Sequence, residues 1–270
     1  MTDAQKKKII SDIRLFLFDM DGTLYLGDRL FGFAPELLET IRKSGRRYMF
    51  LTNNSSKSVK DYVAKLARLG ISSVEDDFFT SSQATAVYLD RYHKGKTLYV
   101  CGTESLKAEL RKAGYTVSEE LENIEVVVMG FDTELTFKKL DDVSRLLTCR
   151  DLPYLATNPD LVCPTEYGSV PDCGSMCMMI KNATGKTPTV IGKPSPMMIE
   201  LAAQKAGVDK SRVAVVGDRI YTDIKSGLNA GVHTMLVMSG ETDERILAGS
   251  PDKPELVLGD ASEILEALKQ

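Results

Sequence analysis

Short apolar runs alternate with helix-like stretches along this chain, and this alternation most restricts the folds open to it. The clearest run is Leu15–Phe18, four consecutive apolar residues of the kind that fill a parallel sheet covered on both faces. Helical patterns bounded by proline and glycine follow it, such as Pro35–Ser44 before Gly45 and Ser58–Leu69 before Gly70. The alternation predicts an α/β fold with a mainly parallel sheet.

The same patterns recur to the end of the chain. Further strands are expected at Tyr48–Leu51, Thr97–Val100, Ile124–Met129, Tyr154–Ala156, Val213–Val216 and His233–Val237. Further helices are expected at Ser105–Ala113, Phe137–Leu147, Ser195–Ala206, Thr222–Ala230 and Ala261–Leu268. In open α/β sheets, ligands bind outside the carboxyl ends of the strands. Polar residues that directly follow a strand are therefore the first candidates for a functional site.

Composition argues against several other classes of protein. The 270 residues, 43% of them hydrophobic and 27% charged, suit one or two globular domains. With 34 basic and 38 acidic residues the formal net charge is -4, so no nucleic-acid partner is expected. No apolar stretch approaches the length of a membrane span, so no membrane partner is expected either.

Charged residues and cysteines indicate the compartment. Lys6–Lys8 are followed by Asp12, Arg14 and Asp19 before any long apolar segment develops, so no signal peptide is expected. The five cysteines are an odd number without a tight framework, as in proteins whose thiols stay reduced. We therefore expect a cytoplasmic protein.

Two aspartates follow the first expected strand directly. Asp19 and Asp21 are one residue apart and lead into Gly22 and Thr23. An aspartate can attack phosphorus and form an aspartyl-phosphate. A second carboxyl beside it can protonate the leaving oxygen and later accept a proton from water, because like charges push the two pKa values apart. The alternative interpretation is an acidic pair that is merely solvated in a turn.

A second polar segment follows the expected strand Tyr48–Leu51. Thr52 offers a hydroxyl, and Asn53 and Asn54 offer side-chain amides, all of which suit phosphate oxygens. The segment could also serve only to cap the next helix through the serines at positions 55, 56 and 58. Both roles can hold at once.

Lys193 stands between Gly192 and Pro194, just before an expected helix. An ammonium held there could stabilise the three equatorial oxygens of a phosphoryl group during transfer. A loop lysine that is simply solvated is the alternative. Lys193 indicates a phosphate-binding site only in combination with the other polar segments.

Asp218 follows the expected strand Val213–Val216 and Gly217, where it is well placed to bind a metal. Asp223 could order water or Lys193 beside that metal. It could instead be a helix N-terminal carboxylate favoured by the helix dipole. Mg²⁺ is the expected cation, because it prefers one or two carboxylates together with waters and a substrate phosphate oxygen.

Taken together, these motifs resemble those of the haloacid dehalogenase superfamily. The motif residues, in order, are Asp19-Met20-Asp21-Gly22-Thr23, Thr52, Lys193, and Gly217-Asp218 with Thr222-Asp223. The match runs from about residue 13 onward. The segments TNN at 52–54, GKPSP at 192–196 and GDRIYTDI at 217–224 are similar to those of the NagD-like, 4-nitrophenylphosphatase subfamily.

The resemblance implies a Rossmann-like parallel-sheet core and a Mg²⁺-dependent phosphatase. It implies that Asp19 is the nucleophile and Asp21 the general acid and base. The metal would be held by the carboxylate of Asp19, the backbone carbonyl of Asp21 and the side chain of Asp218.

The interval between Thr52 and Lys193 is far longer than one crossover connection requires. We expect an inserted α/β cap domain at residues 82–183 and a catalytic core formed by residues 1–81 and 184–270. The large cap type is what the resemblance implies at this place. Such a cap would exclude water during phosphorylation and shape the pocket for the leaving group.

Two loops of the expected cap, residues 157–160 and 171–176, carry candidate substrate contacts. Asn158, Asp160 and Ser175 are polar, and Gly174 could begin a helix whose amides face an anion. Both loops could instead be ordinary turns. With the resemblance, we take them as candidates for substrate specificity.

The leading hypothesis is a phosphatase that hydrolyses a small phosphomonoester through an aspartyl-phosphate. The substrate class is a sugar phosphate, a nucleotide or an aryl phosphate, so the expected partner is a small phosphorylated metabolite. A phosphomutase and a non-catalytic phospho-ligand-binding protein of the same fold are the alternatives. The oligomeric state stays open, although surfaces of the cap could support a homodimer.

Overall fold

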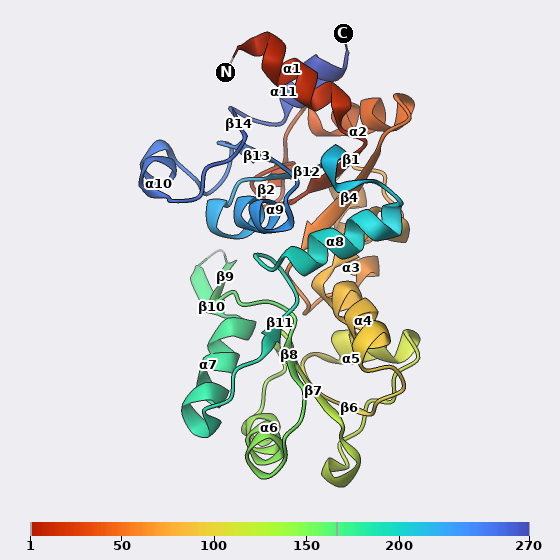
Figure 1. Ribbon diagram of the computed structural model, residues 1–270, viewed down its shortest axis with the longest axis vertical. Coiled ribbons are helices and arrows are strands. Elements are labelled where there is room, and N and C mark those ends of the chain that lie inside the picture. Colours follow the sequence, from red (N-terminus) through yellow and green to blue (C-terminus); the bar gives the residue numbers. More distant parts are fainter. Residues whose placement is uncertain (1, 166, 270) are drawn as a thin grey trace. The chain divides into compact units, whose positions relative to one another are not determined.

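The computed structural model describes residues 2–165 and 167–269, and the chain forms two compact units (Figure 1). The first unit comprises the residues up to Thr52, Val59–Phe79, and the residues from Lys193 onward. The second unit comprises Asn53–Ser58 and Thr80–Gly192. Both units are built from strands alternating with helices, and the predicted α/β class is confirmed.

A six-stranded sheet forms the centre of the first unit, in the order β14-β13-β12-β1-β4-β5. Its strands are β1 (Leu15–Phe18), β4 (Arg47–Thr52), β5 (Phe78–Thr80), β12 (Val213–Gly217), β13 (His233–Val237) and β14 (Leu256–Leu258). β1 pairs in parallel with both β4 and β12. β4, which follows β1 early in the sequence, lies on one side of β1, and β12, which comes late in the sequence, lies on the other side. The order of the strands therefore reverses at β1. Such a reversal in strand order is where parallel α/β sheets bind ligands.

Helices and one small hairpin complete the first unit. The helices are α1 (Asp3–Asp12), α2 (Ala34–Lys43), α3 (Val59–Leu69), α8 (Pro196–Ala206), α9 (Lys225–Ala230), α10 (Glu244–Gly249) and α11 (Ser262–Leu268). The hairpin consists of β2 (Tyr25–Leu26) and β3 (Arg29–Leu30), and short 3₁₀ turns cover Glu75–Asp77 and Lys210–Arg212. The expected helix at Thr222–Ala230 is wrong in its first three residues. That stretch begins with a π-helical turn, η4 (Ile220–Ile224), and α9 follows it. π-helical turns occur frequently at functional sites.

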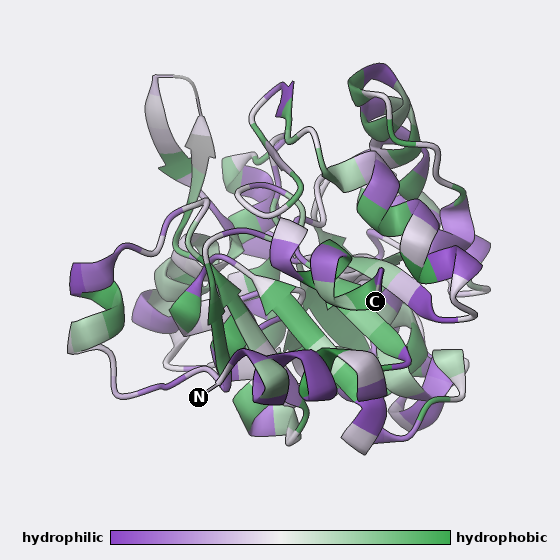
Figure 2. Cartoon of the chain, turned by 90° about the horizontal axis from the view of Figure 1, so that it is seen from above, coloured by the Kyte–Doolittle hydropathy of each residue, from purple (hydrophilic) through white to green (hydrophobic). Residues whose placement is uncertain are grey.

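The core of the first unit follows from its sequence pattern. The β1 strand is buried along its whole length, and the strands of the sheet are hydrophobic (Figure 2). In α2, Leu37, Leu38 and Ile41 recur at helical spacing and are buried, while Pro35 lies at the helix start. Phe50 of β4 packs against Phe78 of β5 at 5.0 Å between ring centroids. The hydrophobic effect therefore buries the apolar side chains on both faces of the sheet, and polar residues lie at the ends of its strands.

The second unit has its own parallel sheet of four strands, in the order β11-β8-β7-β6. These strands are β6 (Leu98–Cys101), β7 (Val126–Met129), β8 (Tyr154–Ala156) and β11 (Thr189–Val190), and a separate hairpin joins β9 (Val162–Thr165) to β10 (Gly168–Pro171). The helices are α4 (Ser81–Tyr92), α5 (Glu104–Lys112), α6 (Phe137–Cys149) and α7 (Cys173–Thr184), with a short 3₁₀ turn at Leu121–Asn123. All five cysteines are free thiols. Among the described residues, the helices are too short or too polar to span a membrane.

Leu66 offers a test of the core of the first unit. This leucine of α3 is fully buried, so Leu66→Ala should lower the free energy of unfolding by about 2–5 kcal/mol through lost apolar contact and a residual cavity. Leu228→Ala is the matched control, because Leu228 lies on α9 with 40% of its surface exposed and should cost less than about 1 kcal/mol. Urea unfolding of both variants measures the difference. Equal losses would contradict the assigned core.

Candidate active site

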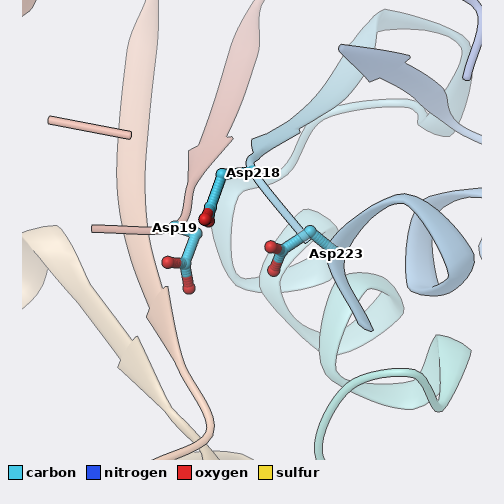
Figure 3. Close-up of side chains that lie close together, drawn as sticks. All are labelled: Asp19, Asp218 and Asp223. Atoms are coloured by element: carbon cyan, nitrogen blue, oxygen red, sulfur yellow. The ribbon is translucent and has the colours of Figure 1, made fainter. Parts of the chain in front are cut away.

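Three aspartates meet at the carboxyl end of the first sheet. Asp19 follows β1, Asp218 follows β12, and Asp223 lies in η4. Figure 3 shows their side chains close together, and one oxygen from each lies within 4.8 Å of the others. The sheet itself brings two of them together, because β1 and β12 are parallel neighbours and the Asp19 amide donates to the carbonyl of Val216 at 2.8 Å.

Lys193 lies against two of these carboxylates. Its Nζ is 2.6 Å from Asp19 Oδ1 and 2.6 Å from Asp223 Oδ1. The lysine side chain is buried, with 4% of its surface exposed. Burial alone lowers the pKa of Lys193, but the charges of Asp19 and Asp223 outweigh it and raise the pKa above its ordinary value. The ammonium is therefore charged at physiological pH.

One ammonium does not balance three carboxylates. Burial, together with the charges of Asp19 and Asp223, raises the pKa of Asp218 to about 7. Burial also raises the pKa of Asp223, to about 6, against the opposing effect of Lys193. The site thus carries surplus negative charge in a region with little water, an arrangement that favours a bound cation.

The oxygens of Asp218 show that the residues present fit a metal ion. Asp218 Oδ2 accepts a hydrogen bond from the backbone amide of Glu241 at 2.7 Å. Asp218 Oδ1 is buried, and no described residue donates a hydrogen bond to it. A buried carboxylate oxygen without a donor is costly unless a ligand satisfies it. Carboxylate oxygens are the ligands that Mg²⁺ and Ca²⁺ prefer.

Two glycines form a cradle around Asp218. A Cβ added at Gly22 would lie 2.4 Å from Asp218 Oδ2, and one added at Gly240 would lie 2.1 Å from the same atom. Gly22 has a φ of +83°, which disfavours other residues independently of space. The hydroxyl of Ser239 donates to the Gly22 carbonyl at 2.7 Å and links the two sides of the cradle. The backbone therefore packs directly against the carboxylate.

Asp21 has a different setting from Asp19. It is exposed, and its Oδ1 accepts a hydrogen bond from the amide of Gly27 at 3.2 Å, in the turn between β2 and β3. Its carboxylate is not part of the cluster of three. Its predicted backbone contact to a metal and its role as acid and base stay predictions.

The polar segment after β4 divides between the two units. Thr52 is the last residue of β4 and is buried, at the same end of the sheet as Asp19. Asn53 belongs to the second unit, where its side-chain amide donates to Asp160 Oδ2 at 3.0 Å. Asn54 Oδ1 accepts from both the amide and the hydroxyl of Ser56, at 2.8 and 2.7 Å. Binding of phosphate by these three residues stays a prediction.

The candidate residues of the second unit take part in its internal hydrogen bonds. Asn158 donates to the carbonyl of Asn53 at 2.7 Å. The Gly174 amide donates to the carbonyl of Asp160 at 2.8 Å, and the Ser175 hydroxyl donates to the carbonyl of Leu161 at 2.5 Å. Gly174 does lie in the first turn of α7. Because its amide already has an acceptor, it is not an open donor for an anion, and the substrate contacts of these residues stay predictions.

Several residues of the site were not identified from sequence. Arg219 follows Asp218, and its Nε lies 2.9 Å from Glu241 Oε2. This contact is an ion pair in which the N–H is not aligned for a hydrogen bond. Burial lowers the pKa of Arg219, but the nearby carboxylates, Asp19 first, raise it overall. Ser239, Gly240 and Glu241 follow β13, and only their place after a strand could have indicated a role.

Comparison with known proteins agrees with this geometry. Residues 16–116 match the model of the haloacid dehalogenase-like hydrolases, and residues 190–264 match a second model described as HAD-hydrolase-like. The 5'-nucleotidase YutF of Bacillus subtilis is 36% identical over 88% of this chain and 92% of its own length.

Solved structures give the same result. The 4-nitrophenylphosphatase of Thermotoga maritima has a TM-score of 0.92 and 39% identity, covering 96% of this chain and 99% of its own. NagD from E. coli K-12 has a TM-score of 0.86 and 31% identity, covering 93% and 98%. The glycerol phosphate phosphatase Rv1692 of Mycobacterium tuberculosis, solved in complex with magnesium, has a TM-score of 0.88 and 29% identity, covering 95% and 77%.

Fold and site together define an α/β protein with an acidic centre at the switch point of its parallel sheet. The chain belongs to the haloacid dehalogenase-like hydrolases, and within them it is NagD-like. The resemblance inferred from the motifs is confirmed. The expected enzyme class, a phosphoric monoester hydrolase of this family, is confirmed as well.

The cradle predicts a specific effect of Gly240→Ala. Gly240 is not among the glycines with positive φ, so only the clash with Asp218 opposes the substitution. We expect a loss of about 1–3 kcal/mol in the free energy of unfolding from overpacking. We also expect phosphate release to fall at least about tenfold, because the carboxylate moves.

Gly249→Ala is the matched control, because a Cβ there meets no described atom within 4 Å. Urea unfolding and a phosphate-release assay compare the two variants. A Gly240→Ala protein with the stability and rate of this control would contradict the packing assigned to the cradle.

The raised carboxyl pKa values predict how stability depends on pH when metal is removed. The pKa of Asp218 is about 7 in the folded chain, above the ordinary value near 3.8, so the folded state binds more protons between these values. In EDTA, the contribution of Asp218 to the free energy of unfolding should therefore increase as the pH falls from about 8 to about 5.

Asp218→Asn removes this titration, so the difference in unfolding free energy between wild type and variant should change across that range. Asp12→Asn, at an exposed position of α1, is the control variant. Urea unfolding at several pH values measures both. A difference that stays constant across this pH range for Asp218→Asn would show that the pKa of Asp218 is not raised.

Proposed function

We propose that this chain is a Mg²⁺-dependent phosphatase that hydrolyses small phosphomonoesters, with Asp19 as its nucleophile. The observation that carries the proposal is the cluster of half-buried Asp19 with buried Asp218 and Asp223 beside the ammonium of Lys193, with Asp218 Oδ1 lacking any described donor. A divalent cation would offset the surplus negative charge and satisfy the free oxygen, and it would also attract the anionic phosphoryl group of a substrate.

Asp19 would attack the phosphorus through a carboxylate oxygen. As the new O–P bond forms, the bond from phosphorus to the ester oxygen breaks, and Asp21 gives its proton to that leaving oxygen. Asp21, now ionised, then takes a proton from a water molecule that attacks the aspartyl-phosphate. Inorganic phosphate leaves and the Asp19 carboxylate is restored. The exposed position of Asp21 beside the hairpin turn suits a group that exchanges protons with water and product.

Lys193 would hold Asp19 in place and supply positive charge to the phosphoryl oxygens. Its contacts at 2.6 Å to Asp19 and Asp223 fix the ammonium without help from substrate, so it is positioned before substrate binds. Asp223 would act through this lysine, and Thr52 would contact the phosphoryl group from the neighbouring strand end.

The metal would be held by the carboxylates of Asp19 and Asp218 and by the backbone carbonyl of Asp21. When bound, a divalent cation neutralises charge and polarises a phosphoryl oxygen. The magnesium complex of the related glycerol phosphate phosphatase supports Mg²⁺ as the ion for this chain. Asp223 oxygens already receive hydrogen bonds from Lys193 and from the amide of Arg219, which supports a role beside the metal rather than on it.

The names of the relatives support a proposal for the substrate class. Their names include a 5'-nucleotidase, an acid sugar phosphatase and a 4-nitrophenylphosphatase, so we propose a sugar phosphate, nucleotide or aryl phosphate. Residues 82–183 would act as the cap, and Asn53, Asn158, Gly174 and Ser175 stay candidates for substrate contacts. A cytoplasmic location and a small phosphorylated metabolite as partner belong to this proposal.

Phosphate release from a panel of sugar phosphates, nucleotides and 4-nitrophenyl phosphate tests the proposal. Release should require Mg²⁺, stop in EDTA, and fall roughly a thousandfold or more in Asp19→Asn, because the nucleophile is lost. Asp12→Asn, an exposed aspartate on α1, should retain the wild-type rate.

Three results would contradict the proposal. Release that continues in EDTA would remove the metal from the mechanism. Transfer of phosphate to a second substrate position, without release to water, would identify a phosphomutase instead. Binding of the panel compounds without any turnover, by folded protein in Mg²⁺, would identify a non-catalytic phospho-ligand-binding protein.

A further inference from the structure

Arg219 brings a second cation to the edge of the acidic cluster. It directly follows Asp218, and its backbone amide donates to Asp223 Oδ2 at 3.2 Å. A guanidinium has five donors and binds carboxylates in a bidentate manner, so an unrestrained arginine here would pair with the cluster. It would then compete with a divalent cation for the same oxygens.

The side chain of Glu241 holds this arginine. Glu241 Oε2 lies 2.9 Å from Arg219 Nε, and Glu241 Oε1 accepts a hydrogen bond from the hydroxyl of Tyr221 at 2.5 Å. Both carboxylate oxygens are therefore engaged with residues of the segment that runs from Asp218 to Asp223. The contact to Tyr221 fixes the orientation of the carboxylate that receives the guanidinium.

The backbone of the same residue orients Asp218. The Glu241 amide donates to Asp218 Oδ2 at 2.7 Å, and the Thr242 amide donates to the Asp218 carbonyl at 3.2 Å. One oxygen of Asp218 is thus held by the loop after β13, while the other is left without a described donor.

We propose that Glu241 is a positioning residue for the metal-binding carboxylates, with its side chain holding Arg219 back from them and its backbone aligning Asp218. The inference rests on the proposed Mg²⁺ site and concerns how that site keeps its oxygens available. Glu241 itself would contact neither substrate nor metal.

If the ion pair between Arg219 and Glu241 had only a structural role, its loss would affect stability and not metal binding. The side chains of Arg219 and Glu241 are 30% and 41% exposed, and exposed ion pairs contribute little to stability. Loss of the pair should therefore leave stability almost unchanged. If the pair instead restrains a competing cation, its loss weakens metal binding, and removal of the arginine as well restores it.

Calorimetric titration of the full chain with Mg²⁺ separates the two roles. Glu241→Gln should weaken Mg²⁺ affinity about tenfold, which is the effect typical of mutating a residue that orients a metal ligand without binding the metal itself. The backbone contact to Asp218 is kept in this variant. The double variant Arg219→Gln with Glu241→Gln should recover to within about threefold of wild type, since the competing charge is gone. Glu244→Gln, at an exposed position in the first turn of α10, is the matched control and should bind like wild type.

Unchanged Mg²⁺ affinity in Glu241→Gln would overturn the inference, and so would an equal loss in the single and double variants. In either case the wild-type titration still shows whether the metal site exists. A wild-type chain that binds no Mg²⁺ and releases phosphate in EDTA would overturn the proposed metal requirement first and this inference with it.

Discussion

The site depends on an imbalance of charge that the sheet itself creates. Because β1 and β12 are parallel neighbours, the residues that follow them must lie side by side, and both strands are followed by an aspartate. Asp223 adds a third carboxylate, and Lys193 supplies one positive charge. A buried charge that has lost its partner costs about 3–5 kcal/mol. The cluster is therefore suited to binding a cation.

The surrounding backbone is shaped by this cluster. Gly22 and Gly240 let two loops approach Asp218 more closely than any side chain would allow, and Ser239 joins these loops. The close approach excludes water from one oxygen of Asp218, and the amide of Glu241 replaces it. Rigid orientation of a ligand by its neighbours is what a metal site needs, since small displacements of ligating oxygens lower affinity and rate.

Local patterns were enough to predict most of the fold. The strands Leu15–Phe18, Tyr154–Ala156 and His233–Val237 are found with the expected ends, because apolar runs and their polar boundaries are local signals. Helix α4 was missed because its pattern is weakly amphipathic, although Thr80 and Gln83 form a capping box that could have marked its start. The π-helical turn η4 was also missed, since helical propensity does not distinguish it from an α-helix. The proximity of Glu241 to Arg219 depends on neighbouring strands β12 and β13, so no spacing in the sequence could indicate it.

The charge state of Lys193 constrains any account of how this site responds to pH. A buried lysine without partners loses its proton easily, but the two carboxylates at 2.6 Å reverse that tendency. The ammonium therefore stays charged across the range in which Asp218 and Asp223 titrate. Changes in the charge of the site near neutral pH must then arise from the carboxylates. Their protonation removes the negative charge that a cation would bind. A bound cation lowers their pKa values and removes this sensitivity, so metal binding and proton release are linked at the same oxygens.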